Sequence, residues 1–471
     1  MVMDMYELTM SNGYLNQGFK DTWVAFDVFY RNNPDNGGFA IFAGLQQVVE
    51  YIENLHFSEE DVEYLRSKRL FTEEFLEYLL HFRFRGDIYA MKEGTVMYPN
   101  EPVMTVVAPL IDAQLIETTI LLEINHQSLI ATKTNRIVQA ANGKPVSDFG
   151  ARRAHNVDAA VYGARAAYIG GAAGTATVLA GKMFHIPISG TMAHSWVMTF
   201  DSEYDAFKAY AESYPDGTVL LVDTYDVLKS GVPNAIRTAR EVLEPMGKKL
   251  IGIRLDSGDL AYLSKEARKM LDEAGLPDCM IVASNSLDEY TISSLNRQGA
   301  KIDSYGVGER LITSSSTPVF GAVYKLVAIQ KCGKFIPKIK ISETAEKITN
   351  PGIKEVYRVY DENGKAVADY LAVKGEQIRD LEPVRYVDPV NYWKNRSFVG
   401  CRFKKLQVPV FEKGKRIYDL PDIEEIRQYV KDQLENEIWE EEQRFENAHT
   451  HYLDMSPAMF ELKMSLLHEE N

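Results

Sequence analysis

The sequence predicts an α/β protein with a barrel-like central region of parallel strands. Between about residues 130 and 345, short apolar runs alternate with helix-forming stretches, as in folds whose buried strands are joined by crossover helices. On both sides of this region the pattern changes to mixed helices and strands. The number of strand–helix repeats favours closure of the central sheet toward a barrel.

Residues 1 to about 130 are predicted to form an α+β region. Apolar residues recur at three- and four-residue spacing over 45–55 and 58–80, which indicates amphipathic helices. Aromatic and β-branched residues alternate with others over 21–30 and 87–104, bounded by Gly, Pro and Asn. This pattern indicates strands separated by turns.

The central region is predicted to alternate between buried strands and helices. Its expected strands are 186–189, 219–222, 250–255, 280–283 and 302–307. The expected helices between them include 225–243, 261–273 and 287–297. The tail returns to strands at 357–361 and 366–372, and then to a Glu-rich helix at 422–445. One apolar stripe on that helix indicates a solvated helix packed on the protein, with partner binding as the less common alternative.

Composition limits the class of function. A chain of 471 residues can bury a large core and is expected to fold as two domains. Its net charge of -15 argues against general nucleic-acid or membrane-surface binding. Cys279, Cys332 and Cys401 are far apart and form no CxxC pair, so neither a disulfide framework nor a zinc site is expected. With no signal peptide or membrane-spanning run visible, a cytoplasmic location is expected.

Three polar clusters follow apolar or small-residue runs between 146 and 196. They are DFGARR at 148–153, Gly174–Thr175, and Gly190–Thr191 followed by His194. The carboxyl ends of parallel strands are where α/β folds place their chemistry. An aromatic ring, two guanidiniums and a histidine at one edge would suit a flat, anionic substrate. The alternative for the first cluster is a turn with surface arginines.

Two further clusters end later strands. Arg254 and Asp256 alternate with Leu255 at a strand end, and a charged pair there is costly unless it is paired or used. Asp259 is more simply a helix cap. The GVGER sequence at 306–310 places two glycines before a possible helix, which suits phosphate binding, although an ordinary turn is the commoner meaning of such a motif. Neither a Walker lysine loop nor a dinucleotide GxGxxG motif is present.

His194 lies in a small-residue loop after a predicted strand. A lone histidine is usually a surface or core residue, and no HExxH-type spacing surrounds this one. Asp223, which follows the strand at 219–222, could accept a hydrogen bond from the imidazole and fix its tautomer.

Taken together, these clusters resemble the nicotinate phosphoribosyltransferases, type II phosphoribosyltransferases of NAD synthesis. The resemblance covers nearly the whole chain. It rests on DMYELTMSNGY at 4–14, FDVFYRNNPDNGGFAIFAGL at 26–45, SDFGARRAHN at 147–156, GTMAHSW at 190–196, LVDTYDVLKSGVPNAI at 221–236, RLDSGDL at 254–260, SNSLDE at 284–289 and GVGERLITSSSTPVFGAVYKLV at 306–327.

The resemblance implies an irregular (β/α) barrel over 131–359 and a second α+β domain formed by 1–130 and 360–471. It also implies a head-to-tail homodimer with shared active sites. The implied reaction is ATP-coupled transfer of phosphoribosyl from 5-phosphoribosyl 1-diphosphate to nicotinate, which gives nicotinate mononucleotide and pyrophosphate. Mg²⁺ would act through the pyrophosphate, near Asp256, with no direct protein ligation.

The resemblance assigns residues to the two sides of the site. Tyr6 of a neighbouring subunit and Phe149 would sandwich the nicotinate ring, as planar rings favour. Arg254 and Thr191 would hold the substrate side, and Thr175 is a further expected substrate-binding residue.

On the phosphoribosyl side, Arg152 would bind the ribose phosphate or the carboxylate. The remaining assignments are Gly308 and the backbone of Glu309 for the 5-phosphate, Asp256, Asn285 and Asp288 for the ribose and magnesium, Lys340 and Lys347 for pyrophosphate or ATP, and His194 as the phosphorylated histidine with Asp223 as its partner. Many members of the family carry a smaller residue at the position of Glu309.

Alternatives remain. Nicotinamide-using relatives place an aspartate where this chain has Ala176, and an aspartate would repel the carboxylate of nicotinate. Quinolinate enzymes need no ATP-linked histidine loop. A barrel lyase or aldolase would need a Schiff-base lysine, and none of the strand ends above has one. A non-catalytic binding protein of the same fold is the last alternative, disfavoured by the presence of His194, Asp256 and Tyr6.

Overall fold

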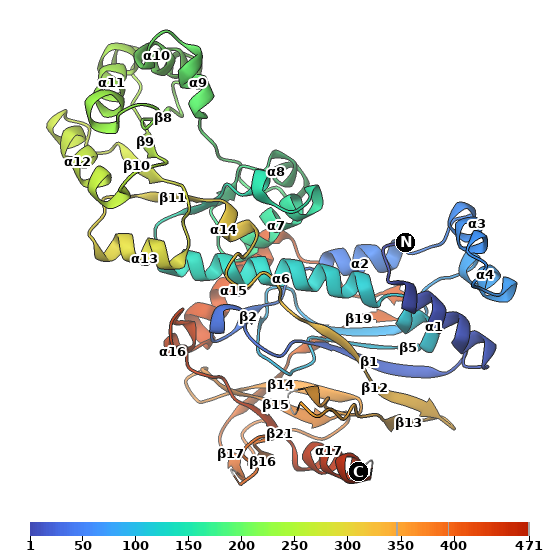
Figure 1. The fold of residues 1–471 in the computed structure, drawn as a ribbon. Coiled ribbons are helices and arrows are strands. Elements are labelled where there is room, and N and C mark those ends of the chain that lie inside the picture. Colours follow the sequence, from blue (N-terminus) through green and yellow to red (C-terminus); the bar gives the residue numbers. More distant parts are fainter. Residues whose placement is uncertain (345–346, 394, 470–471) are drawn as a thin grey trace. The chain divides into compact units, whose positions relative to one another are not determined.

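The computed structural model describes residues 1–344, 347–393 and 395–469, and the chain divides into two compact units (Figure 1). Unit 1 comprises Met1–Leu129 and Val319–Asn471, and unit 2 comprises Ile130–Pro318. The central unit therefore ends earlier than the expected boundary at 359. The reason is strand pairing: β12 (Val323–Lys331) joins β1 (Trp23–Phe29) of unit 1, and β14 (Lys354–Tyr360) joins β15 (Ala366–Val373).

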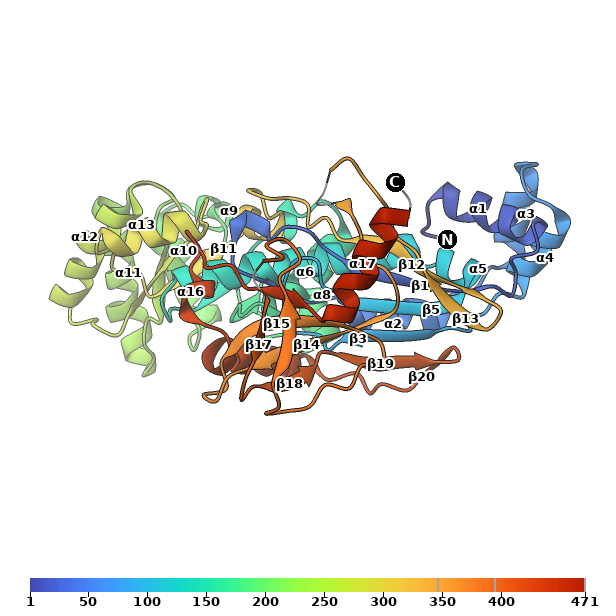
Figure 2. The same cartoon turned by 90° about the horizontal axis from the view of Figure 1, so that it is seen from below.

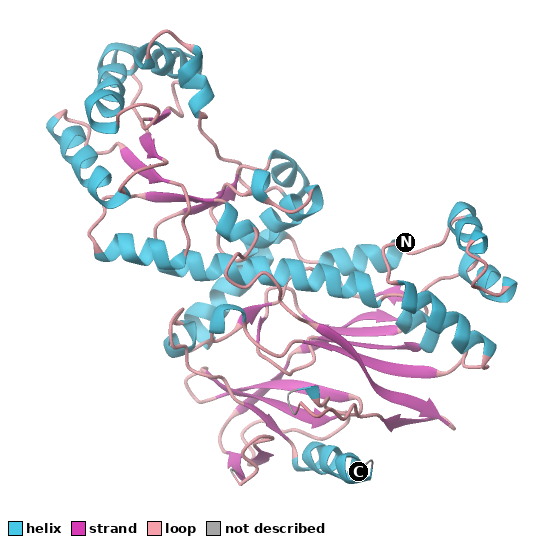
Figure 3. Ribbon diagram, viewed as in Figure 1, coloured by secondary structure: helices cyan, strands magenta, loops and turns pink. Residues whose placement is uncertain are grey.

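Unit 2 is built on six parallel strands, shown in magenta in Figure 3. They are β6 (Val146–Asp148), β7 (Gly174–Thr175), β8 (Val219–Leu221), β9 (Gly252–Leu255), β10 (Met280–Ala283) and β11 (Ser304–Val307). Their order in the sheet is β7-β6-β11-β10-β9-β8, and each neighbouring pair is parallel. The predicted α/β class with parallel strands is confirmed.

Closure of this sheet is only partial. Because β7 and β8 lie at the two edges of the six-stranded sheet, the unit is a half-barrel. The strand expected at 186–189 contributes only an isolated bridge between Ile188 and Thr175. Ile188 is 59% exposed, so its apolar side chain gains little from joining the sheet. Pro187 also lacks the N–H that a ladder position needs.

Helix caps in unit 2 lie directly after the strand ends. Asp259 accepts a hydrogen bond from the Tyr262 N–H at the start of α12 (Leu260–Glu273), as the sequence predicted. Asp288 accepts one from Thr291 at the start of α13 (Glu289–Arg297). The other helices are α7 (Val157–Ile169), α8 (Val178–Phe184), α9 (His194–Thr199), α10 (Glu203–Ser213), α11 (Val232–Thr238) and α14 (Glu309–Ile312).

Unit 1 contains two larger sheets. Antiparallel strands pair in the order β13-β12-β1-β5-β3-β19-β20 in one sheet, and the other has the order β17-β16-β21-β15-β14-β18. The remaining strands of these sheets are β3 (Asp87–Met91), β5 (Met104–Pro109), β13 (Lys334–Pro337), β16 (Val384–Val387), β17 (Asn395–Phe398), β18 (Arg402–Lys405), β19 (Gln407–Glu412), β20 (Lys415–Arg416) and β21 (Leu453–Met455). Strands β2 (Ala40–Ile41) and β4 (Val96–Met97) form a separate pair.

Unit 1 also contains helices in both of its chain segments. They are α1 (Met5–Asn16), α2 (Leu45–Asn54), α3 (Glu59–Ser67), α4 (Glu73–Leu80), α5 (Leu110–Gln114), α15 (Ile423–Asp432), α16 (Glu440–Gln443) and α17 (Pro457–Glu469), and α6 (Glu117–Ala140) contains the boundary with unit 2. Helix α17 contacts β15 (Figure 2). No helix in the described ranges has the length and apolarity needed to cross a membrane.

Two long helices expected in unit 1 are interrupted. The stretch 58–80 forms α3 and α4, because Arg69 adopts a left-handed backbone (φ +54°) and the Thr72 hydroxyl caps a new helix. The stretch 422–445 forms α15, a π-helical turn (Gln433–Glu437) and α16. Ile426, Val430 and Ile438 of its apolar stripe are buried, as the amphipathic pattern predicted.

A buried ionic network connects distant segments of unit 1. Arg358 of β14 donates from Nε and Nη2 to the two carboxylate oxygens of Asp369 on β15, at 2.9 and 2.8 Å. The His451 ring stacks on Tyr98 at 3.7 Å between centroids. Its Nδ1 lies 3.0 Å from Glu442, and its Nε2 lies 3.6 Å from Asp369. Burial alone would lower the pKa of His451, but the hydrogen bonds and charges of Asp369 and Glu442 outweigh it and raise the pKa.

We expect His451→Gln to destabilise unit 1 by about 3 kcal/mol near pH 6, because two buried carboxylates lose a cation. A raised pKa means that the imidazolium stabilises the fold fully below its usual value of 6.5 and progressively less as the pH rises through the folded value. Denaturant unfolding at pH 6 and pH 9 should therefore show a smaller loss at pH 9. Exposed His449 supplies the control, His449→Gln; an equal loss in both variants would contradict the network's role.

Candidate active site

A cavity of about 230 Å³ opens at the carboxyl ends of the unit 2 strands. Residues following β6, β9, β10 and β11 line it, so four strand ends meet there. The lining residues are Phe149, Arg152, Arg153, Arg254, Asp256, Ser284, Asn285, Ser286, Gly306, Gly308, Glu309 and Arg310. The sequence-predicted clusters at 148–153, 254–259 and 306–310 are thereby brought together.

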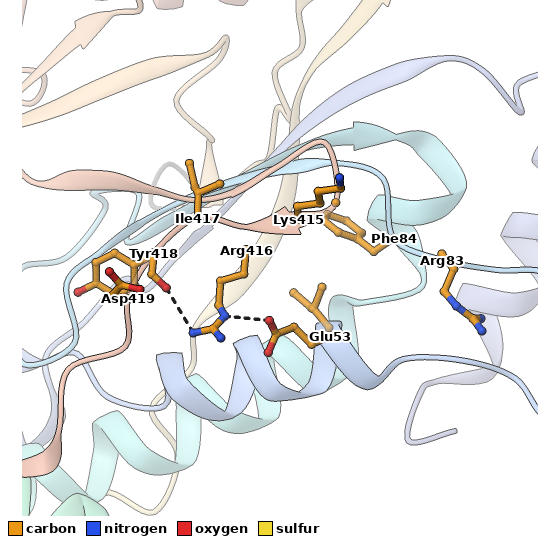
Figure 4. A pocket seen from close by; sticks show the side chains of 10 residues that line it. Glu53, Arg83, Phe84, Lys415, Arg416, Ile417, Tyr418 and Asp419 are labelled. Carbon is orange, nitrogen blue, oxygen red and sulfur yellow. Dashed lines mark hydrogen bonds and ion pairs between the residues drawn. The ribbon is translucent and has the colours of Figure 1, made fainter.

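A larger cavity of about 530 Å³ lies in unit 1 and lacks this convergence (Figure 4). Its Arg416 is paired with Glu53 at 2.8 Å and also donates to the Tyr418 carbonyl. Arg83 points away from Arg416 in Figure 4, and its guanidinium donates to the Phe82 carbonyl. None of the sequence-predicted site residues lines this cavity. The smaller cavity is therefore the candidate active site, because the sequence-predicted residues line it.

Phe149 forms the aromatic wall of the unit 2 cavity. Its ring lies against Gly306 of β11, where an added Cβ would stand 2.4 Å from the ring carbons. The Arg254 guanidinium lies 5.5 Å from the ring centroid, within the range of a cation–π interaction. A glycine at position 306 is therefore a steric requirement for the placement of this ring.

Asp148 holds the turn that presents Phe149. Its buried carboxylate accepts hydrogen bonds from the Thr175 hydroxyl at 2.7 Å and the Gly150 N–H at 2.8 Å. Burial raises the pKa of Asp148, although both hydrogen bonds oppose the rise. The Thr175 hydroxyl also accepts from the Thr177 N–H. Thr175, expected to bind substrate, therefore supports the β6–β7 edge and is absent from the cavity lining.

Arg254 is held by several neighbours, the Met192 carbonyl at 3.3 Å among them. Its guanidinium donates to Asp256 at 3.1 Å, to the Ser284 hydroxyl at 2.9 Å and to the Thr191 hydroxyl at 3.1 Å. Ser284 in turn donates to Asp256. Arg254 and Asp256 at the end of β9 thus form an ion pair, which offsets the cost of placing two charges at a strand end. Ser284, which the sequence analysis did not single out, joins the ends of β9 and β10.

His194 begins α9 and lies between two carboxylates and a hydroxyl. Its Nε2 lies 3.9 Å from Asp223 Oδ1 and 3.8 Å from Asp256 Oδ2. Its Nδ1 lies 3.1 Å from Thr224 Oγ1. The other oxygen of Asp223 accepts from the Ser257 hydroxyl at 2.5 Å and from the Asp256 N–H at 3.1 Å.

These surroundings favour one tautomer of His194. Asp223 Oδ1 is buried without a hydrogen-bond partner in the described part of the chain, so it is aimed at the imidazole as an acceptor. A proton on Nε2 would face this oxygen from 3.9 Å and leaves the lone pair on Nδ1, which can accept from Thr224. Asp223 was predicted from the sequence as the histidine's partner. Thr224 was missed, although it directly follows Asp223.

The other side of the cavity is rich in arginine. Arg310 is paired with Asp288 at 2.5 Å, and Arg153 lies 3.7 Å from Glu309. Burial alone would raise the pKa of Asp288, but hydrogen bonds from Thr291 and Arg310 lower it. Asp288, expected to face the ribose, caps α13, pairs with Arg310 and is absent from the cavity lining.

Two consecutive residues at the edge of this cavity have an unusual backbone conformation. Asn285 (φ +83°) and Ser286 (φ +50°) both adopt the left-handed region that non-glycine residues rarely occupy. Strain of this kind is found preferentially at functional sites. Gly308 precedes α14, and a Cβ added to it would lie only 3.2 Å from the Phe149 carbonyl oxygen, so a larger residue there would crowd the loop.

Three predicted residues belong to unit 1 and are not part of this cavity. Tyr6 lies on α1 and is 42% exposed. Lys340 and Lys347 are exposed and flank residues outside the described ranges. Within the described residues, no group of three or more His, Cys, Asp and Glu side chains is arranged to hold a metal ion.

Comparison with known proteins gives consistent matches along the chain. Models of the nicotinate phosphoribosyltransferase N-terminal domain, family and C-terminal domain match residues 1–125, 145–363 and 353–463. Nicotinate phosphoribosyltransferase of Bacillus subtilis is 47% identical over 99% of this chain and 94% of its own length. The Dictyostelium discoideum enzyme of that name is 36% identical, over 98% of this chain and 87% of its own.

Solved structures agree with these matches. The crystal structure of human nicotinic acid phosphoribosyltransferase aligns with a TM-score of 0.88 and 26% identity, covering 99% of this chain and 100% of the human one. The human chain and this chain are therefore similar in fold over nearly their whole lengths.

We expect Asp148→Ala to destabilise unit 2 by about 2 kcal/mol, because it leaves the Thr175 hydroxyl and the Gly150 N–H without their buried acceptor. Thermal unfolding would measure the loss. Asp158 is exposed on α7, and Asp158→Ala should change stability by no more than about 0.5 kcal/mol. Similar losses in both variants would rule out a supporting role for Asp148.

Proposed function

The chain belongs to the nicotinate phosphoribosyltransferase family, and from this premise we propose that it couples ATP hydrolysis to the transfer of phosphoribosyl onto nicotinate. The donor is 5-phosphoribosyl 1-diphosphate, and the products are nicotinate mononucleotide and pyrophosphate, a step of NAD salvage. The observation that carries the proposal is the placement of His194 beside Asp223 and Asp256, next to the arginine-lined cavity.

Nicotinate binds on the Phe149 side of the cavity. The planar ring stacks on Phe149, and the guanidinium of Arg254, positioned by Thr191, binds the carboxylate. We place the protein as a homodimer in which Tyr6 of the partner subunit covers the other face of the ring. The exposed position of Tyr6 on α1 is consistent with that role.

The phosphoribosyl group binds on the arginine-rich side. Arg152 has no carboxylate partner in the described part of the chain and is available for phosphate. The backbone N–H groups at Gly308 and Glu309 begin α14, where an anion is stabilised. Lys340 and Lys347 remain candidates for pyrophosphate or ATP.

Asp256 and Asn285 line the cavity with oxygen atoms of the kind that Mg²⁺ prefers. Magnesium carried by the pyrophosphate would neutralise charge on that leaving group. Direct ligation by protein side chains is not needed for this role.

In the transfer step, the ring nitrogen of nicotinate forms a bond to the anomeric carbon. The bond from that carbon to the pyrophosphate oxygen breaks, and pyrophosphate leaves with the electron pair. Positive charge develops on the ribose in the transition state, and the Asp256 carboxylate stabilises it.

In the ATP-coupled step, His194 Nδ1 attacks the γ-phosphorus of ATP, and ADP leaves. Asp223 holds the proton on Nε2 and stabilises the imidazolium character that develops as the N–P bond forms. Thr224 is close enough to Nδ1 to orient the ring beforehand. Water later hydrolyses the phosphohistidine. The added negative charge beside the site would shift the affinity for substrate and product.

The rival substrates share the fold. Ala176 follows Thr175 and is exposed, so no carboxylate is present at that position to accept from the amide of nicotinamide. Neither quinolinate transfer nor a non-catalytic function would give a role to His194 and the carboxylates around it. We place the protein in the cytoplasm, consistent with three unpaired cysteines.

Purified protein with magnesium, phosphoribosyl diphosphate and nicotinate should form nicotinate mononucleotide, and ATP should increase the yield. His194→Asn should abolish the ATP-dependent increase and the acid-labile phosphate incorporated from ATP, while retaining slow ATP-independent transfer. The physical reason is loss of the nucleophilic nitrogen with little change in side-chain volume. Product chromatography and phosphate labelling give the two readouts.

His155 is exposed on unit 2 and does not line the cavity, so His155→Asn serves as the control and should retain both signals. ATP stimulation that persists in His194→Asn would exclude His194 as the phosphorylated residue. Absence of product from nicotinate, nicotinamide and quinolinate would favour the non-catalytic alternative.

We expect Ala176→Asp to raise the KM for nicotinate by about tenfold or more, because a carboxylate would face the anionic substrate at short range. The KM for phosphoribosyl diphosphate should change little. Initial rates with nicotinate and nicotinamide measure the effect, and Ala176→Asn separates charge from size. Unchanged selectivity in Ala176→Asp would show that position 176 does not face the pyridine substituent.

A further inference from the structure

The arginines around the unit 2 cavity differ in how closely they are paired with carboxylates. Arg254 donates to Asp256 at 3.1 Å, and Arg310 donates to Asp288 at 2.5 Å. Both pairs are hydrogen-bonded, and their carboxylates are only 24% and 15% exposed. Arg254 and Arg310 are therefore held in fixed positions in the cavity wall.

The pair between Arg153 and Glu309 is different. Arg153 Nε lies 3.7 Å from Glu309 Oε2, beyond hydrogen-bond distance, and both side chains are 62% exposed. Exposed ion pairs of this kind contribute little to stability, and salt screens them. An incoming anion could therefore displace Glu309 from Arg153 without disturbing the fold.

Glu309 also occupies a critical position in the chain. It is the first residue of α14, directly after Gly308, and its side chain lines the same cavity as Arg152 and Arg153. A carboxylate beside the Arg153 guanidinium competes with any phosphate for the same positive charge. The Glu309 carboxylate is itself negatively charged, so it repels the anion that the arginines of this wall would bind.

We propose that the Glu309 side chain sets the affinity for the phosphate end of the substrate by competing for Arg153 and repelling the phosphate. This inference rests on the proposed function, since it concerns the phosphoribosyl side of that cavity. The backbone of Glu309 can still donate to the phosphate while its side chain weakens binding. Arg153 is released from Glu309 when the phosphate binds.

The effect applies to ground state and transition state alike. The 5-phosphate does not take part in bond breaking, so the repulsion opposes substrate, transition state and nucleotide product to similar extents. It therefore raises KM and speeds product release without entering the chemical step. Glu309 is an affinity-setting residue and makes no contact with the reacting atoms.

The test is direct titration of the full-length protein with phosphoribosyl diphosphate and magnesium, followed by steady-state kinetics. Glu309→Gln should bind the ligand about three- to tenfold more tightly at low salt, as removal of a like charge a few ångströms away predicts. The gain should shrink at high ionic strength because the repulsion is screened. KM for the donor should fall by a similar factor, with the KM for nicotinate unchanged.

Two further variants distinguish charge from shape. Glu273 is 67% exposed and 4.0 Å from Lys269 on α12, so Glu273→Gln removes a comparable pair away from the cavity and should leave binding unchanged. Arg153→Gln should weaken binding. Should Glu309→Gln fail to fold, Glu309→Ala provides the same test of charge.

The outcomes separate this inference from the function it rests on. No binding of the donor by the unaltered protein would overturn the proposed function. Normal binding and turnover by the unaltered protein, with equal or weaker binding by Glu309→Gln, would overturn the inference alone. Tighter binding that does not depend on salt would also overturn it, because the mechanism is electrostatic.

Discussion

The site depends on the pairing of carboxylates at the ends of β8 and β9. Asp223 and Asp256 are close enough that both approach Nε2 of His194 within 4 Å. Other groups hold both carboxylates in place: Asp223 accepts from the Asp256 N–H and Ser257, and Asp256 accepts from Arg254 and Ser284. The hydrogen bonds that stabilise the carboxylates also fix the spacing of the strand ends. Placement of the histidine and of Arg254 follows from that spacing.

Much of this arrangement could be predicted from the sequence, because parallel strands collect their carboxyl ends at one edge. Phe149, Arg254 and Gly308 therefore line a common cavity as expected. Thr175 and Asp288 were harder to assign, since threonine and aspartate serve as hydrogen-bond acceptors for nearby backbone groups as readily as for substrate. Local sequence does not reveal which role a side chain takes. That choice depends on Asp148 and Arg310, which approach these two residues from elsewhere in the unit.

The fold shows a similar division between local and distant causes. The cap at Asp259 is local, and the sequence predicted it. Partial closure of the sheet depends on whether Ile188 becomes buried against another part of the unit. Hydrophobic periodicity in the sequence does not reveal this. The boundary of unit 2 depends on pairing of β12 with β1, strands far apart in the sequence. In unit 1, the network of Arg358, Asp369 and His451 likewise joins segments that no short motif connects.

The electrostatic layout of the cavity follows from the difficulty of keeping several arginines close together. Unpaired guanidiniums would repel one another and bind anions indiscriminately, in a protein whose net charge is -15. Pairing Arg254 and Arg310 with partly buried aspartates orients both groups but leaves less positive charge for a ligand. In the proposed function, Arg152, and Arg153 once freed from Glu309, would supply the charge that responds to an incoming phosphate. A cavity wall of this kind combines fixed pairs, which define shape, with exposed charges, which determine affinity.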